Sequence, residues 1–149
     1  MKDVMMLTGA GQIGMAIARR MGFNKKILVG DKKLENALAI TKIMTDAGFD
    51  AFAVEVNIAS RASIVKMIDE AQTHGEITTL INAAGVSPSQ APIDVILQVD
   101  LYGTAVLLEE VGKVITPGGA GVTISSQSGH RMPALSCEVD EQLATTPTE

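Results

Sequence analysis

Short apolar runs alternate along this chain with longer segments in which apolar residues recur at helical spacing. The runs are typical of buried strands, and they lie at residues 4–8, 27–30, 51–56, 77–81 and 121–125. The segments predict helices with one apolar face, and they lie at residues 12–21, 34–47, 60–73 and 93–115. Short apolar strands separated by helices are typical of a parallel sheet covered on both faces. We therefore predict an α/β fold.

The stretch from residue 130 to residue 149 does not continue this alternation. It contains two prolines and several acidic residues, and it shows at most a short helix over residues 139–144. We predict a domain over residues 1–129 and an irregular C-terminal segment over residues 130–149. We interpret that segment as the start of a truncated or inserted region.

The first predicted helix carries four apolar residues on one side, namely Ile13, Ala16, Ile17 and Met21. Because an amphipathic helix turns its apolar side toward the core, we expect this side to face the sheet.

Composition narrows the classes of function that the chain can perform. Its formal net charge is −5 and only 3% of its residues are aromatic, which argues against nucleic-acid binding. No apolar stretch reaches the length of about 20 residues that a membrane-spanning helix needs. The single cysteine, Cys137, excludes an intrachain disulfide, and no Cys/His spacing indicates a metal site. We predict a cytoplasmic protein that binds neither nucleic acid, membrane nor metal.

The first apolar run leads directly into a Gly-x-Gly-x-x-Gly turn at residues 9–14, and a helix pattern follows at once. Gly9 allows a sharp turn, Gly11 leaves room for a pyrophosphate near the backbone, and Gly14 allows the helix to pack closely on the strand. The N–H groups at the start of a helix suit a phosphate. In this context the spacing predicts a dinucleotide-binding βαβ unit.

Asp31 ends the second apolar run, 22 residues after Gly9, close to the spacing of about 20 expected for the acid that binds the adenosine ribose. Its charge should repel a 2′-phosphate, so we predict NAD, while Lys32 and Lys33 leave NADP open. Two alternatives are a glycine-rich turn without a ligand and a methyltransferase, which also uses a glycine turn and an acid. The motif over residues 82–85 and the serines after the fifth strand speak against the methyltransferase.

Four further motifs follow in order along the chain. They are Asn57-Ile58, Asn82-Ala83-Ala84-Gly85, Val99-Asp100-Leu101-Tyr102-Gly103-Thr104 and Ile124-Ser125-Ser126-Gln127-Ser128-Gly129. With these motifs, residues 4 to about 129 resemble the short-chain dehydrogenase/reductase family, whose commonest branch spaces its turn as Gly-x-x-x-Gly-x-Gly. The resemblance implies a Rossmann-type doubly wound parallel sheet, with helices on both faces and strand order 3-2-1-4-5.

The resemblance also implies a role for each motif, and it agrees with the rule that open α/β sheets bind ligands outside the C-terminal ends of their strands. The implied cofactor residues are Thr8, Gly9, Gly11, Gln12, Ile13 and Gly14 for the pyrophosphate, Asp31 for the ribose, Asn57 and Ile58 for the adenine, and Asn82, Ala83, Ala84 and Gly85 for the sugar and nicotinamide side. Ser126 would polarise the substrate oxygen. Asp100 stands where the family has a catalytic Asn; its other interpretation is a helix-surface acid.

The Tyr-x-x-x-Lys pair of the family is missing, because the only tyrosine is Tyr102 and position 106 is Val. In the family, that tyrosine donates the proton as hydride reaches a carbonyl carbon. Three explanations are open: truncation between the serine and the tyrosine, an insertion after Gly129, or a non-catalytic protein. We interpret the parent as an NAD(P)-dependent oxidoreductase acting on a hydroxyl/carbonyl small molecule, with this chain alone inactive. The alternative is a non-catalytic dinucleotide-binding or regulatory module.

Several apolar residues on the fifth predicted strand and the fourth predicted helix have no predicted element to pack against. They are Val122, Ile124, Ile96, Leu97, Val106, Leu107, Val111 and Val114. An exposed apolar face beside an unpaired strand edge favours self-association. We therefore predict a homo-oligomer formed through helix 93–115 or the strand edge.

Overall fold

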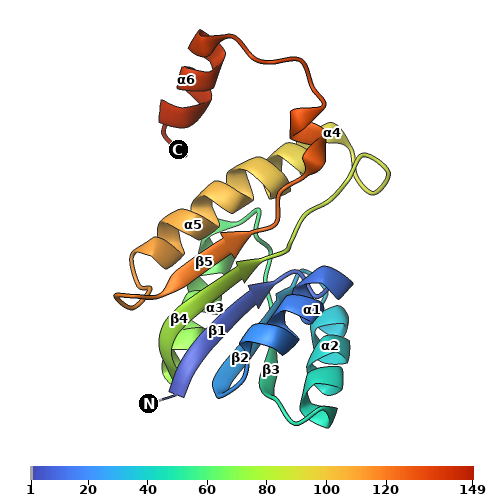
Figure 1. Ribbon diagram of the computed structural model, residues 1–149, viewed down its shortest axis with the longest axis vertical. Coiled ribbons are helices and arrows are strands. Elements are labelled where there is room, and N and C mark those ends of the chain that lie inside the picture. The colour runs from blue at the N-terminus through green and yellow to red at the C-terminus, as the bar shows by residue number, and fades with distance from the viewer. Residues whose placement is uncertain (1) are drawn as a thin grey trace.

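The computed structural model describes residues 2–149 and shows a five-stranded parallel sheet in the order β3-β2-β1-β4-β5 (Figure 1). The strands are β1 (Lys2–Thr8), β2 (Lys25–Asp31), β3 (Asp50–Glu55), β4 (Gly75–Asn82) and β5 (Ala120–Thr123). The helices flanking the sheet are α1 (Gln12–Met21), α2 (Leu34–Asp46), α3 (Arg61–His74) and α5 (Thr104–Gly112). The predicted α/β class, parallel sheet and strand order are confirmed.

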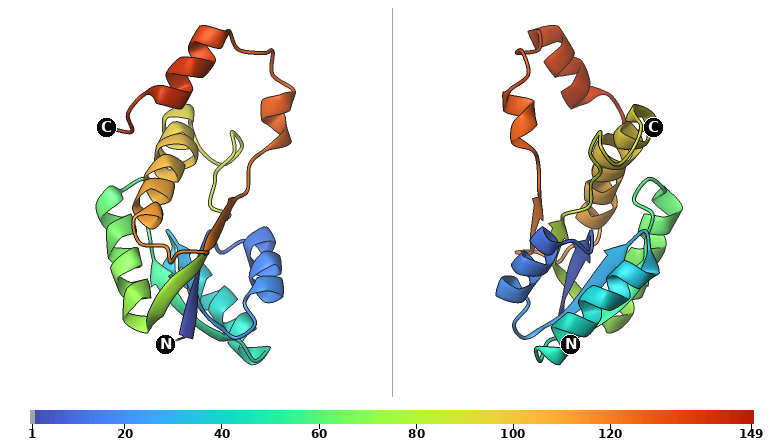
Figure 2. Two further views of the ribbon diagram at one scale, coloured as in Figure 1. Left: turned by 60° about the vertical axis from the view of Figure 1, so that its left-hand side comes forward. Right: turned by 90° about the vertical axis from the view of Figure 1, so that its right-hand side faces the viewer.

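The core consists of two apolar layers, one on each face of the sheet. On β1, Val4 and Met6 belong to the layer beneath α3 and α5, while Met5 and Leu7 belong to the layer beneath α1 and α2. All four side chains are fully buried. Figure 2 shows the helices on both sides of the sheet, which explains why the central strand is apolar throughout.

The helix predicted over residues 93–115 has three parts. They are α4 (Ile93–Ile96), the π-helical η1 (Leu97–Gly103) and α5, which ends at Gly112. At Gly103 the run passes against the loop after β3, because a Cβ there would lie only 2.6 Å from the carbonyl oxygen of Ile58. A π-turn inside a helix often accompanies a functional site. The prediction of one regular helix is therefore wrong at the place where the run meets another loop.

The side of α1 that faces the sheet differs in part from the predicted one, because Ile17 packs against the core as expected but Ile13 and Met21 do not. Its buried residues are Gly14 and Ala18, whereas Ile13 and Met21 are 60% and 53% exposed. A Cβ on Gly14 would lie 2.8 Å from the Leu7 Cδ1 atom, so α1 lies very close to the sheet at this residue. A helix that begins at a tight turn lies too close to its strand for a larger side chain.

The chain after β5 contains η2 (Gln127–His130), a 3-10 turn, and α6 (Cys137–Thr145). The helix is thus longer than the one predicted over residues 139–144, and the Ser136 hydroxyl caps it by accepting the Val139 N–H. Every residue from 131 to 147 is exposed. Figures 1 and 2 show this segment, which we call the arm (residues 131–149), arching away from the sheet.

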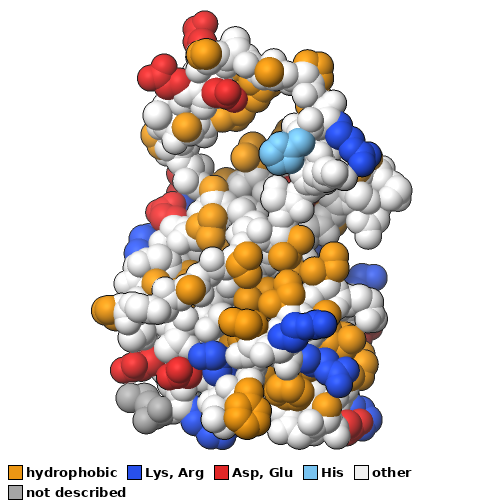
Figure 3. All heavy atoms as spheres, viewed as in Figure 1, with side chains coloured by type: hydrophobic (Ala, Val, Ile, Leu, Met, Phe, Trp, Pro, Cys, Tyr) orange, Lys and Arg blue, Asp and Glu red, His pale blue; other side chains and the backbone are white. Residues whose placement is uncertain are grey.

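The apolar residues expected to lack cover differ in their burial: Leu97 is 51% exposed, Ile96 is half-buried, and Val114 packs against the layer beneath α3 and α5. Val106, Leu107 and Val111 of α5 are buried in the layer that they share with α3, so the prediction is wrong for them. Val122 and Ile124 are 44% and 38% exposed, so it is confirmed for β5 and the residue after it. Figure 3 shows hydrophobic side chains gathered on this face of the molecule, over β5 and α1.

Two further observations concern membrane-spanning helices and metal ligands. No helix within residues 2–149 has both the length and the apolar character needed to cross a membrane. Across the same residues, no group of three or more metal-ligating side chains comes together.

Candidate cofactor site

A cleft of about 340 Å³ opens at the C-terminal ends of the strands, where open parallel sheets bind their ligands. Its walls come from the loops after β1, β2, β3 and β4 and from the α4–η1 run. The lining residues are Gly9, Ala10, Gly11, Gly30, Asp31, Lys32, Asn36, Val56, Asn57, Ile58, Ala83, Ala84, Gly85, Val86, Val95 and Val99.

The predicted cofactor residues divide into those that line this cleft and those that do not. The lining members are Gly9, Gly11, Asp31, Asn57, Ile58, Ala83, Ala84 and Gly85. Thr8, Gly14 and Asn82 are buried outside the lining, and Gln12 and Ile13 lie on the exposed first turn of α1. Sequence reasoning missed Asn36 as a lining residue, and its only signal was its place in the first turn of the helix after Asp31.

The glycine turn brings β1 and the loop after β4 into close contact. Gly9 has φ +90°, and its N–H donates to the Gly30 carbonyl at 2.8 Å. A Cβ on Gly9 would lie 2.5 Å from the Ala84 nitrogen, so only glycine fits here. A Cβ on Gly11 would instead meet nothing within 4 Å. Gly11 therefore borders open space at the start of α1, which has no side-chain cap over its first N–H groups.

Asp31 connects two of the loops that line the cleft. One carboxylate oxygen accepts the Ala10 N–H at 3.0 Å, and the other accepts the Lys33 N–H at 2.9 Å and the Asn36 amide at 3.3 Å. The carboxylate is held at the mouth of the cleft by these donors and retains acceptor capacity for a hydroxyl group.

On the adenine side of the predicted site, Asn57 shapes the loop after β3. Its side-chain oxygen accepts the Ala59 N–H at 3.1 Å, and its own N–H donates to the Ser63 hydroxyl at 2.9 Å. The loop therefore turns directly into α3, whose first N–H groups are capped by Ser60. This turn places Asn57 and Ile58 on the cleft wall.

Asn82 is a buried residue that connects the segments around the cleft. Its side chain is fully buried, and its oxygen accepts the Thr8 hydroxyl at 2.8 Å and the Ala84 N–H at 3.4 Å. Its amide donates to the Thr104 hydroxyl at 3.4 Å. These bonds connect β1, the loop after β4 and α5, so the Asn82 side chain fixes the position of the residues that do line the cleft.

Asp100 lies on η1 and contacts the loop after β4. Its carboxylate accepts the Val86 N–H at 3.0 Å, and a Cβ on Gly85 would lie 3.3 Å from the same oxygen. The π-helical run thus contacts both ends of the cleft wall, through Asp100 at Val86 and through Gly103 at Ile58.

Ser126 and Tyr102 lie outside the cleft lining. The Ser126 hydroxyl accepts the Ser128 N–H at 3.1 Å and caps η2. The Tyr102 hydroxyl donates to the Glu149 carboxylate at 2.6 Å, and Tyr102 borders a different cavity, beneath the arm. Because Tyr102 is the only tyrosine, the 149 residues supply no phenol to the cofactor cleft.

The chain is similar to known proteins in both sequence and structure. The sequence model of the family described as short chain dehydrogenase matches residues 3–137. A short-chain dehydrogenase/reductase of Alternaria brassicicola, bsc3, is 37% identical over 131 residues, covering 88% of this chain and 48% of that protein. Tropinone reductase-like 3 of Erythroxylum coca is 24% identical, with 82% and 51% covered. The chain thus spans about half the length of the curated relatives it matches.

Solved structures show the same fold. A short-chain dehydrogenase/reductase from Burkholderia phymatum in complex with NAD has a TM-score of 0.75 at 20% identity, with 86% of this chain and 50% of that chain covered. The actinorhodin polyketide ketoreductase F189W variant with NADPH has a TM-score of 0.74 at 23% identity, with 87% and 55% covered.

Proposed function

The chain belongs to the short-chain dehydrogenase/reductase family, and from that membership we propose that its cleft holds the nicotinamide dinucleotide of an oxidoreductase. The complete protein would interconvert a hydroxyl and a carbonyl group on a small molecule, with the nicotinamide supplying or accepting the hydride. One observation carries this proposal: the open space at Gly11 lies on the same cleft as the Asp31 carboxylate.

Each part of the cleft fits one part of such a cofactor. The turn from Gly9 to Gly14, with the free N–H groups at the start of α1, suits the pyrophosphate. Asp31 suits the adenosine ribose, and the wall at Asn57 and Ile58 suits the adenine. The loop from Ala83 to Gly85 borders the other end of the cleft, where the nicotinamide side would lie.

Ser126 is our candidate for polarising the substrate oxygen, and Asp100 for a role beside the nicotinamide. Ser126 stands on the exposed connection after β5, outside the residues that line the cleft. Proton donation at the carbonyl oxygen needs a further group, because Tyr102 lies elsewhere. The chain alone should therefore bind cofactor weakly and not turn over substrate.

We further propose NAD over NADP, because the Asp31 charge opposes a 2′-phosphate. Lys32 also lines the cleft and could pair with that phosphate, so the two cofactors must be compared directly. We also propose that the protein is cytoplasmic and that it forms a homo-oligomer through the α4–α5 run. The exposed Leu97, Leu101 and Leu108 on that run support the homo-oligomer.

A second candidate function is a non-catalytic dinucleotide-binding module. The placement of Tyr102 outside the cleft favours it. The two candidates differ in the sequence of the whole protein, since a Tyr-x-x-x-Lys beyond residue 149 would decide for the enzyme.

The experiment that tests the proposed cleft compares NADH binding by the chain and by two glycine variants, followed by nicotinamide fluorescence. Gly11→Val should abolish binding, because its methyl groups would fill the pyrophosphate space. Gly112→Val is the matched control, since a Cβ at Gly112 also meets nothing within 4 Å but lies at the end of α5. Equal binding by both variants would place the cofactor elsewhere.

A further inference from the structure

Asn36 lies beside Asp31 on the wall of the cofactor cleft and forms a hydrogen bond with it. Its side-chain N–H donates to the Oδ1 atom of the Asp31 carboxylate at 3.3 Å, and both residues line the cleft. Because an ionised carboxylate can only accept, the Asn36 amide must turn its N–H toward Asp31, which leaves its own oxygen for another donor. No residue among 2–149 donates to that oxygen.

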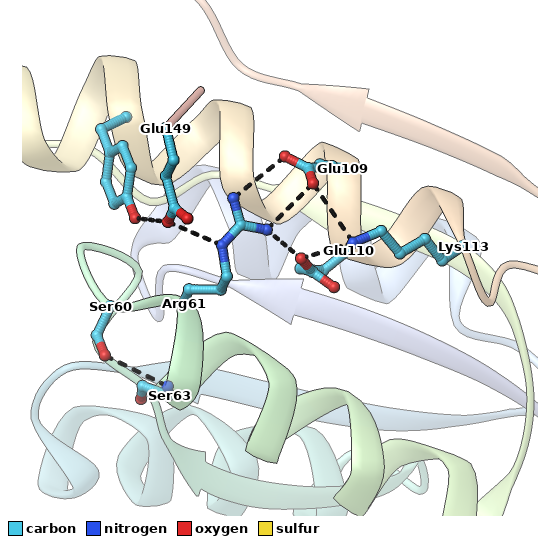
Figure 4. A network of polar contacts seen from close by, with 8 residues as sticks. Ser60, Arg61, Ser63, Glu109, Glu110, Lys113 and Glu149 are labelled. Atoms are coloured by element: carbon cyan, nitrogen blue, oxygen red, sulfur yellow. Dashed lines mark hydrogen bonds and ion pairs between the residues drawn. The ribbon is translucent and has the colours of Figure 1, made fainter. Parts of the chain in front are cut away.

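The start of α2 depends on Asp31 because the helix has no side-chain cap of its own. Lys33 precedes the helix, and its side chain caps none of the first N–H groups. By contrast, the Ser60 hydroxyl accepts the Ser63 N–H at the start of α3 (Figure 4). In α2 it is Asp31, at the end of β2, that accepts the Lys33 N–H at 2.9 Å. The same carboxylate thus orders both the first turn of α2 and the Asn36 side chain on that turn.

The Asp31 carboxylate has little acceptor capacity left for a ligand. A carboxylate offers about four acceptor positions, divided between its two oxygens. The Lys33 N–H and the Asn36 amide both donate to Oδ1, and the Ala10 N–H donates to Oδ2 at 3.0 Å. About one position therefore remains, and it lies on Oδ2, the oxygen that is bonded to the glycine turn.

We propose that Asn36 is a second residue that binds the adenosine ribose, an inference that rests on the proposed dinucleotide function of the cleft. The ribose carries two neighbouring hydroxyl groups and so brings two donors. Asp31 accepts one hydroxyl at its remaining position, and the Asn36 side-chain oxygen accepts the other. The amide thus holds the carboxylate through its N–H and the ribose through its oxygen. A fully ionised 2′-phosphate offers no hydroxyl donor, so this oxygen adds to the preference for NAD that the Asp31 charge provides.

The test measures the binding of NADH, 2′-deoxy NADH and 3′-deoxy NADH by nicotinamide fluorescence, where each deoxy cofactor lacks one hydroxyl of the adenosine ribose. Asn36 is exposed, so Asn36→Ala should fold like the wild type. It should bind NADH about three- to tenfold more weakly, because one hydrogen bond is lost. The wild type should bind both deoxy cofactors more weakly than NADH. Asn36→Ala should bind one of them as well as NADH, since the acceptor of the missing hydroxyl is gone, and the other more weakly, since Asp31 remains.

Lys113→Ala is the matched control, because it also removes a side-chain donor from a carboxylate but lies outside the cleft lining. Figure 4 shows this residue in the charge cluster at Arg61, where Lys113 and Arg61 pair with Glu109 and Glu110. The control should bind all three cofactors like the wild type.

The possible results distinguish the role of Asn36 from the proposed function of the cleft. A wild type that does not bind NADH overturns the proposed function, and the role of Asn36 with it. If the wild type binds NADH and Asn36→Ala binds it equally well, only the role of Asn36 is overturned. It is also overturned if Asn36→Ala binds NADH more weakly but still discriminates against both deoxy cofactors, because the substitution then acts through the fold. If Asn36→Ala discriminates against neither, Asn36 only orients Asp31 and does not bind the ribose.

Discussion

The Asp31 carboxylate accepts a hydrogen bond from the Ala10 N–H at 3.0 Å, which ties the glycine turn after β1 to the end of β2. The same group holds the Lys33 N–H and the Asn36 amide. Because a carboxylate offers about four acceptor positions, Asp31 can hold three protein donors and still accept from a ribose hydroxyl. Asp31 thus connects the two segments and is also the residue that we propose binds the adenosine ribose of the cofactor.

These two roles can be separated with two substitutions. Asp31→Ala should weaken NADH binding by about 10- to 100-fold, because it removes the acceptor for the ribose and the link to Ala10. Asp31→Asn keeps an acceptor but removes the charge, so it should raise the affinity for NADPH relative to NADH. Calorimetry with both cofactors measures the ratio.

The control for the Asp31 variants is Asp46→Asn, at the far end of α2, where the carboxylate pairs with Lys42 and with no other residue among 2–149. It should leave both affinities unchanged. Tighter NADPH than NADH binding by the wild type would contradict the assignment to NAD.

We expect the Asn82 side chain to affect the stability of the fold more directly than it affects cofactor binding. Asn82→Ala leaves the buried Thr8 hydroxyl without its partner, so the free energy of unfolding should fall by about 1–3 kcal/mol in urea titration. Asn36→Ala, which is exposed, should change it by no more than about 0.5 kcal/mol. Equal losses for the two variants would mean that the buried bonds to Thr8 and Thr104 contribute little.

The sequence predicts those parts of this molecule that depend on local chemistry. The glycine turn follows from spacing, since a strand that must turn sharply and approach a phosphate needs glycine at fixed positions. The polar residues at strand ends follow from the parallel topology. For these reasons, a cleft containing Gly9, Gly11 and Asp31 could be expected from the sequence, whereas the strand order was expected from the family resemblance.

The parts that were missed depend on contacts between distant segments. The π-turn of η1 lies where Gly103 meets the carbonyl of Ile58, and no periodicity within the helix reveals that neighbour. The burial of Asn82 follows from Thr8 and Thr104 on other elements. The inward side of α1 was predicted correctly at Ile17 but not at Ile13 and Met21, because close packing places Gly14 and Ala18 against the sheet.

Two glycines of one helical run test the origin of the π-turn. In Gly103→Ala the new Cβ would clash with the Ile58 oxygen, so the free energy of unfolding should fall by about 1–3 kcal/mol. In Gly112→Ala the Cβ meets open space, so the change should be neutral or up to about 1 kcal/mol stabilising. Thermal and urea unfolding of the two variants provide the comparison. A stable Gly103→Ala protein would show that the loop after β3 yields readily.

The contact between Tyr102 and Glu149 gives the arm a dependence on pH. Its hydrogen bond raises the pKa of Tyr102, and the same bond, with Arg61, lowers the pKa of Glu149. A raised phenol pKa means stabilisation that is present at neutral pH and lost as pH rises through that pKa. A lowered carboxyl pKa means stabilisation that is lost as pH falls through that pKa. Docking of the arm should therefore be strongest between the two pKa values.

Glu149→Gln tests this relationship directly, because it removes the charge that favours the protonated phenol. The pKa of Tyr102 should fall in this variant toward the ordinary value of about 10. Glu141→Gln should leave it raised, since the Glu141 carboxylate makes no bond to Tyr102. The ultraviolet titration reads both, because no other residue in the chain carries a phenol or an indole. An unchanged pKa in Glu149→Gln would show that the arm does not rest on Tyr102 in solution, and the charge cluster at Arg61 would then consist of Glu109, Glu110 and Lys113 alone.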